Sequence, residues 1–84
     1  MSTKTLFSIY IPATQATLEM WVPDELTVHD ATQLICTVVN DQEGRWFKPD
    51  PNTALYDKLS GDELNINVLV KDLGLVNGSQ LVLM

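Results

Sequence analysis

The chain has 84 residues, with 5 basic and 11 acidic side chains, and its formal net charge is −6. A hydrophobic content of 45% and a charged content of 19% are typical of a single soluble globular domain. Nucleic acid is excluded as the expected partner, because contacts to phosphates need clustered Lys and Arg, and here the basic residues are scattered. The apolar runs are far shorter than the about 18–20 residues of a membrane helix, so we expect no membrane insertion.

The first two predicted elements are strands that form an antiparallel hairpin, residues 5–11 and 16–22. In both segments apolar side chains alternate with others, which is typical of a strand with one buried face. The turn between them sets Leu6 opposite Trp21 and Tyr10 opposite Thr17. The side chains expected to face the interior are Phe7, Ile9, Leu18 and Met20.

A helix is predicted next, over residues 27–39. Its apolar residues recur at helical spacing, so that one face is apolar and the other polar. Thr27 is a suitable N-cap, because its hydroxyl can accept a hydrogen bond from an N–H group of the first turn. Asp30 places a negative charge at the positive end of the helix dipole. The polar residues 40–44 are expected to end the helix.

Shorter elements are predicted in the second half of the chain. Residues 45–48, which include Trp46 and Phe47, read as a third strand that stops before a proline. Residues 53–58 form either another strand or an irregular edge, and residues 64–70 alternate loosely, as in a strand.

The end of the chain is predicted to return to the sheet. A turn or a single 3₁₀ turn is expected over residues 72–75, and Asn77 and Gly78 form a tight turn, since both residues can adopt positive φ. Residues 80–84 are the closing strand. The first and last strands can be parallel only if the chain crosses over between them, and the helix lies on that path. The sequence therefore predicts an α+β fold with one helix packed on a four- or five-stranded mixed sheet.

Three segments resemble a known family. Residues 17–20 (TLEM) and 27–31 (TVHDA) are similar to the second strand and helix start of ubiquitin-like β-grasp domains. Residues 73–83 (LGLVNGSQLVL) resemble the end of such domains, in the version of the small YukD and EsaB proteins of bacterial type VII secretion. The resemblance implies a single ubiquitin-like domain over residues 1–84. It also implies a non-catalytic interaction module that is an accessory or regulatory component of such a system. One cysteine cannot form an internal disulfide and fits a reducing compartment, so we expect a location in the cytoplasm.

Two features depart from the family pattern. Residues 49–67 are more numerous than a minimal ubiquitin-like core needs. Ubiquitin-like modifiers and sulfur carriers end in a flexible Gly-Gly tail, whereas no glycine follows Gly78 in this chain, which ends at Leu83 and Met84. Conjugation is therefore not expected. The alternative is a modifier or sulfur carrier whose tail is absent from this chain.

The chain offers few groups for chemistry, so we expect neither catalysis nor a cofactor or metal. The single cysteine, Cys36, and the single histidine, His29, lie about two helical turns apart, too far for a nucleophile and its base. Cys36 is expected to be a buried thiol, and His29 a solvated residue of the first turn. The carboxylates of Asp57, Asp62 and Glu63 lack the spacing of a calcium loop and read as a solvated acidic loop. That loop could also contact a basic partner surface.

The strand face turned away from the helix is the predicted binding site. Its apolar side chains, with Val82 and Met84 expected close to Leu6, would form one patch around a tryptophan: Leu6, Tyr10, Trp21, Val82 and Met84. Trp and Tyr are frequent anchors of protein contacts, so the expected partner is a protein, and the resemblance implies a component of the secretion machinery. Alternatively, the extra segment of residues 49–67, with Trp46 and Phe47, folds over the patch and buries it. We expect a monomer or a weak homodimer.

Overall fold

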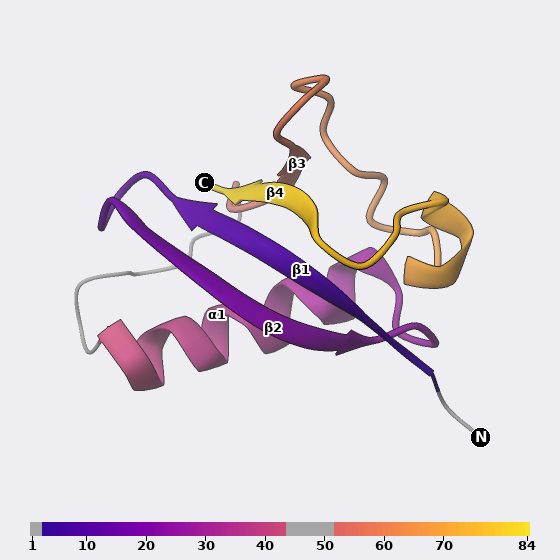
Figure 1. Ribbon diagram of the computed structural model, residues 1–84, viewed down its shortest axis with the longest axis horizontal. Helices are drawn as coiled ribbons and strands as arrows, with labels where there is room; N and C mark the ends of the chain where they lie inside the picture. Colours follow the sequence, from indigo (N-terminus) through magenta and orange to yellow (C-terminus); the bar gives the residue numbers. More distant parts are fainter. Residues whose placement is uncertain (1–2, 44–51) are drawn as a thin grey trace.

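The computed structural model describes residues 3–43 and 52–84 of the chain. One helix crosses one face of a sheet, and a short 3₁₀ helix precedes the last strand (Figure 1). The elements, in chain order, are β1 (Lys4–Ile11), β2 (Ala16–Pro23), α1 (Val28–Glu43), β3 (Leu55–Asp57), η2 (Val70–Leu73) and β4 (Ser79–Leu83).

The sheet has four strands in the order β2-β1-β4-β3. β1 pairs antiparallel with β2 and parallel with β4, and β3 pairs antiparallel with β4, so the sheet is mixed, as predicted. The predicted register of the hairpin is confirmed, since Leu6 pairs with Trp21 and Tyr10 pairs with Thr17. The expected crossover is also present, because α1 lies between the two parallel strands in sequence.

The core lies between α1 and the sheet face that it covers, called here the inner face. Alternate residues of the two central strands are almost completely buried there: Phe7, Ile9, Ile11, Leu81 and Leu83. From α1 they meet residues spaced three or four apart: Val28, Ala31, Ile35 and Val39. Buried apolar residues thus recur every second residue on the strands and about every 3.6 residues on the helix. The strands and the helix both contribute apolar surface that folding removes from water. Leu18 and Met20 of β2 pack against the rim of this core and are half-buried.

Helix α1 begins as predicted but is longer than predicted. The Oγ1 of Thr27 accepts a hydrogen bond from the N–H of Asp30 at 3.1 Å, which confirms the N-cap. The helix continues to Glu43, four residues beyond the expected end at residue 39. Asn40 and Asp41 have only moderately unfavourable helix propensities, so they do not stop a helix that is already packed on a sheet.

The predicted strand over residues 64–70 is wrong. Within the described residues this stretch makes one isolated bridge, between Leu69 and Thr27, and its carbonyl groups instead cap the start of α1. The N–H of Val28 donates to the carbonyl of Val68 at 2.8 Å, and the N–H of His29 donates to that of Ile66 at 3.1 Å. The first N–H groups of a helix have no hydrogen-bond partner within the helix. If residues 64–70 paired as a strand of the sheet, their carbonyls would not be available to these N–H groups.

Of residues 53–58, which were predicted as a strand or an irregular edge, Leu55–Asp57 form strand β3. The strand predicted at residues 45–48 lies outside the described residues. Both predicted turns are present. The 3₁₀ helix η2 is followed by Gly74, which has φ of 73°, and in the turn before β4 Gly78 has φ of 90°. Asn77 fixes the second turn to the sheet, because its Oδ1 accepts a hydrogen bond from the N–H of Leu6 at 3.0 Å.

Asp24 ties three elements together just after β2. Its carboxylate accepts hydrogen bonds from the hydroxyls of Thr5 at 2.6 Å and Thr3 at 2.7 Å, and its carbonyl accepts one from the N–H of Lys71 at 3.0 Å. The hydrogen bond from Thr5, then that from Thr3, and the charge of Lys71 hold the pKa of the Asp24 carboxyl below its ordinary value of 3.8.

Acid is therefore expected to weaken the fold through Asp24. Because its folded-state pKa is lowered, the carboxylate stabilises the fold above its ordinary pKa, and this contribution is lost as the pH falls through the folded-state value. We expect Asp24→Asn to be less stable than the wild type at about pH 6, and the difference to close towards about pH 2. Urea unfolding across this range measures the difference. Glu25→Gln, at the exposed neighbour, is the control, and a difference for Asp24→Asn that does not change with pH contradicts the prediction.

Candidate protein-binding surface

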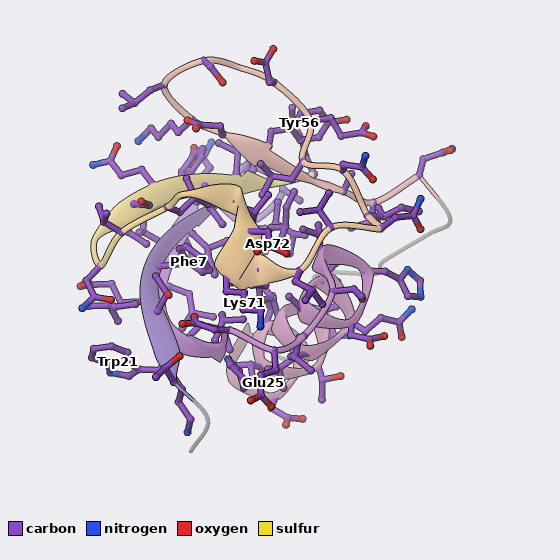
Figure 2. The ribbon with its side chains drawn as sticks, turned by 90° about the vertical axis from the view of Figure 1, so that its right-hand side faces the viewer. Phe7, Trp21, Glu25, Tyr56, Lys71 and Asp72 are labelled. Carbon is purple, nitrogen blue, oxygen red and sulfur yellow. The ribbon has the colours of Figure 1, made fainter. Side chains whose placement is uncertain are left out.

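The five residues of the predicted binding patch lie on the sheet face turned away from α1, called here the outer face. Trp21 and Met84 are 53% and 57% exposed, and Leu6, Tyr10 and Val82 are half-buried. Figure 2 shows Trp21 pointing away from the side of the sheet that α1 covers. The strands explain this placement, because the neighbours of these residues along β1, β2 and β4 point into the core.

The structure divides the patch into two groups. Leu6 lies opposite Trp21, whereas Tyr10 lies beside Val82. Leu6 and Tyr10 are about 13 Å apart along β1, at about 3.3 Å per residue. The expectation that Val82 and Met84 lie close to Leu6 is wrong. The residue beside Leu6 is Gly78, just before β4, and its N–H donates to the Leu6 carbonyl at 2.8 Å.

A polar row separates the two groups. Ser8 pairs with Glu19 of β2 on one side and with Gln80 of β4 on the other. Glu19 and Gln80 are exposed. The outer face therefore carries a Trp21 group (Leu6 and Trp21) and a Tyr10 group (Tyr10, Val82 and the residue described next), with hydrogen-bonding side chains between them. Met84 follows Val82 two residues further along the chain and belongs to neither pair.

Tyr56 completes the Tyr10 group and was missed in the sequence. It pairs with Val82 across β3 and β4, and this pairing puts it on the outer face. The Nζ of Lys58 lies 5.6 Å from the centroid of the Tyr10 ring, a cation–π distance. Glu63 accepts a hydrogen bond from the Tyr56 hydroxyl, which raises the pKa of Tyr56, with smaller effects from burial and from the charge of Glu63. Successive side chains of a strand point to opposite faces, so an apolar Leu55 in the core could have indicated from the sequence that Tyr56 points to the outer face.

Residues 52–67, which belong to the alternative cover for the patch, are described and leave Trp21 53% exposed, whereas Trp46 and Phe47 lie outside the described residues. The binding role of Leu6, Tyr10, Trp21, Val82 and Met84 thus remains a prediction. The structure adds to it the exposure of Trp21 and the division of the face into two groups.

The structure gives the surroundings of the side chains that were considered for chemistry, Cys36, His29 and Asp57. Cys36 is 7% exposed, and burial raises the pKa of its thiol, which disfavours the reactive thiolate. His29 is exposed in the first turn of α1. The Oδ1 of Asp57 accepts hydrogen bonds from the N–H groups of Leu59 at 2.9 Å and Ser60 at 3.4 Å, so this carboxylate shapes its own loop.

The described part of the chain holds no group of three or more His, Cys, Asp or Glu side chains placed to bind a metal ion. Among residues 3–43 and 52–84, no helix has the length and apolar character needed to cross a membrane.

Solved structures share this arrangement of helix and sheet. The chain is similar to Caldiarchaeum subterraneum ubiquitin, with 22% identity, a TM-score of 0.73 and coverage of 96% of this chain and 91% of that one. The fold is the ubiquitin-like β-grasp. The ubiquitin-like domain of the Mycobacterium tuberculosis type VII secretion system protein EccD1 is similar over 98% of both chains, with 18% identity and a TM-score of 0.66.

The ubiquitin-like β-grasp also occurs in enzyme complexes. A chain of the toluene 4-monooxygenase HD complex is similar over 96% of both chains, with a TM-score of 0.81 and 6% identity. Protein-family models and curated protein sequences give no match to the chain. At these identities the likeness establishes the fold, and function has to be argued from the surfaces.

Proposed function

We propose that this chain is a non-catalytic, cytoplasmic protein-interaction module of a type VII secretion system, of the YukD and EsaB kind. The likeness to the EccD1 domain, which extends over 98% of both chains, supports this proposal. The buried Cys36 and the exposed His29 lie seven residues, or about two turns, apart along α1, which is too far for a nucleophile and its base and supports a non-catalytic role.

The observation that carries the proposal is the exposure of Trp21. A tryptophan that is 53% exposed, opposite Leu6 on a sheet face, leaves a large apolar side chain in water. Removing such a side chain from water on binding is favourable, and tryptophan is among the residues that contribute most to protein interfaces. The Tyr10 group provides a second contact area on the same face, with the charge of Lys58 above its ring.

The test is a titration of the ¹⁵N-labelled chain with the purified cytosolic regions of the type VII membrane components from the same host, followed by NMR. We expect saturable shifts of the Leu6, Tyr10 and Trp21 amides. Shifts confined to the exposed side of α1, at Gln33 and Thr37, would contradict an outer-face site. The absence of saturable shifts with every such component would contradict the secretion role.

Sedimentation of the chain alone at several concentrations separates this proposal from self-association. The proposal expects a monomer or a weak homodimer, with the outer face available to another protein. A tight dimer that buries Trp21 would assign the outer face to a second copy instead.

A further inference from the structure

Strand β2 is an open edge of the sheet. In the order β2-β1-β4-β3, the two edge strands are β2 and β3. The far side of β3 is covered by its own loop, since the N–H of Asp57 donates to the carbonyl of Asp62 and the N–H of Leu64 donates to that of Leu55, each at 2.9 Å. β2 pairs only with β1 among the described residues, and this leaves one side of an eight-residue strand without a neighbour.

The hydrogen-bond pattern identifies the backbone groups on this open side. Next to β2, the N–H of Asp24 donates to the carbonyl of Thr3 at 2.9 Å, so residue 24 faces β1. Inward and outward groups alternate along an antiparallel strand. The outward N–H and carbonyl groups are therefore those of Thr17, Glu19 and Trp21.

Little protects this edge against a further strand. Its pairing with β1 runs without a bulge from residue 16 to residue 23, and its proline stands at the last position. Natural edge strands are commonly protected by lysine, an internal proline, a bulge or a short length, and β2 has none of these. A regular, unprotected edge is the structure to which an extended peptide adds as a further strand.

The net charge of the chain is concentrated in the part of the sequence that forms β2 and α1. Residues 16–43, which span β2 and α1, contain six of the 11 acidic residues and none of the five basic ones. The remaining residues therefore carry five acidic and five basic side chains, and the whole net charge of −6 lies in the β2–α1 stretch. The charged side chain of β2 itself is the exposed Glu19, so a basic ligand is attracted to this edge and an acidic one is repelled.

Side chains on both faces of β2 suit such a ligand. On the outer face Glu19 is exposed, with no hydrogen bond or ion pair among the described residues, and Trp21 lies two residues further along the strand. A Lys or Arg of an added strand opposite Glu19 can pair with its carboxylate and lie near the Trp21 ring. On the inner face Leu18 and Met20 are half-buried and would contact apolar side chains of the added strand.

We propose that the open edge of β2 binds an extended segment of a partner protein by strand addition, and that this segment alternates basic with apolar side chains. The inference deepens the proposed function and rests on it, since it specifies how the partner binds. Three outward residues, each with a donor and an acceptor, fix the backbone of the segment, and Glu19 and Trp21 select its side chains.

The test uses synthetic peptides and the intact chain. The first probe is a nine-residue peptide of alternating Lys and Val. The second has Glu in place of Lys, and the third keeps the Lys-Val sequence but carries N-methyl groups on alternate amides, which block strand pairing without changing the charge. We expect the first probe to slow amide hydrogen exchange at Thr17, Glu19 and Trp21 at least tenfold at saturation. The exposed turn residue Ala13 is the internal reference.

Charge-reversal variants test the role of Glu19. We expect Glu19→Lys to weaken binding of the Lys-Val peptide at least tenfold, and Glu25→Lys, which makes the same charge change outside β2, to weaken it less. Equal binding of the N-methylated peptide, or unchanged exchange at the three edge amides, would overturn strand addition. Equal binding of the Glu-Val peptide would overturn the preference for a basic segment.

The outcomes separate this inference from the proposed function. If a secretion component binds the outer face and the three edge amides stay unprotected, the inference is wrong and the proposed function stands. If the Lys-Val peptide protects the edge but no secretion component binds, strand addition stands and the secretion role is wrong.

Discussion

Phe7→Ala is expected to lower the free energy of unfolding by about 3–5 kcal/mol. Phe7 is 2% exposed, and it lies on β1, which is flanked by β2 and β4. Truncation removes the transfer free energy of the ring and leaves a cavity that a packed sheet and helix can fill only partly. A domain of this length has a total stability of about 4–13 kcal/mol, so this one truncation removes a large part of it.

Urea unfolding followed by far-UV circular dichroism measures this loss. Leu59→Ala is the control, because Leu59 is 90% exposed and its truncation should change stability by at most about 0.5 kcal/mol. A loss below about 1 kcal/mol for Phe7→Ala would mean that the inner face of β1 is not the centre of the core.

The parts of the fold that depend on local pattern were predictable from the sequence. Alternation fixed the two long strands, and a short turn fixed their register, so the pairing of Leu6 with Trp21 followed directly. The N-cap at Thr27 was also a local signal, since a cap needs only its own helix. The parallel pairing of β1 with β4 was predicted because parallel strands need a crossover connection and the helix lies between them in sequence.

The parts that depend on distant partners were not predictable. Residues 64–70 alternate as a strand would, but their carbonyls are held by the N–H groups of α1, through contacts about 40 residues apart in sequence, such as that of Val28 with Val68. Similarly, the offset of β4 along β1 is set where Asn77 and Gly78 meet Leu6, and no local signal reports this offset. A shift of a few residues in that offset was enough to move Val82 from the expected vicinity of Leu6 to the side of Tyr10.

The division of the outer face has a consequence for binding. Trp21 belongs both to the outer face and to the open edge, whereas Tyr10 lies on a central strand beside Lys58. Glu19 lies two residues from Trp21 on β2, whereas the Tyr10 group has Lys58 over the Tyr10 ring and Glu63 at the Tyr56 hydroxyl. A partner that contacts both groups therefore meets a carboxylate near Trp21 and charges of both signs at the Tyr10 group.

Trp21→Ala is expected to weaken binding of the secretion component by about 1–3 kcal/mol, or about 5–150-fold in Kd, while the chain stays folded. The reason is that about half of the Trp21 side chain is already in water, so the substitution removes interface area and makes no cavity in the core. Loss of its pairing with Leu6 should cost at most about 1 kcal/mol of folding stability. Isothermal titration calorimetry measures the first quantity, and urea unfolding measures the second.

The matched control for Trp21→Ala is Ile66→Ala. Ile66 is 48% exposed, close to the 53% of Trp21, but it lies in the stretch that caps the start of α1. We expect Ile66→Ala to leave Kd unchanged, because that stretch is not part of the outer face. If Trp21→Ala unfolds the chain, Trp21 belongs to the core and the outer face is not the binding surface. If instead Tyr10→Ala weakens binding and Trp21→Ala does not, the partner uses the Tyr10 group alone, and the edge of β2 has no part in its recognition.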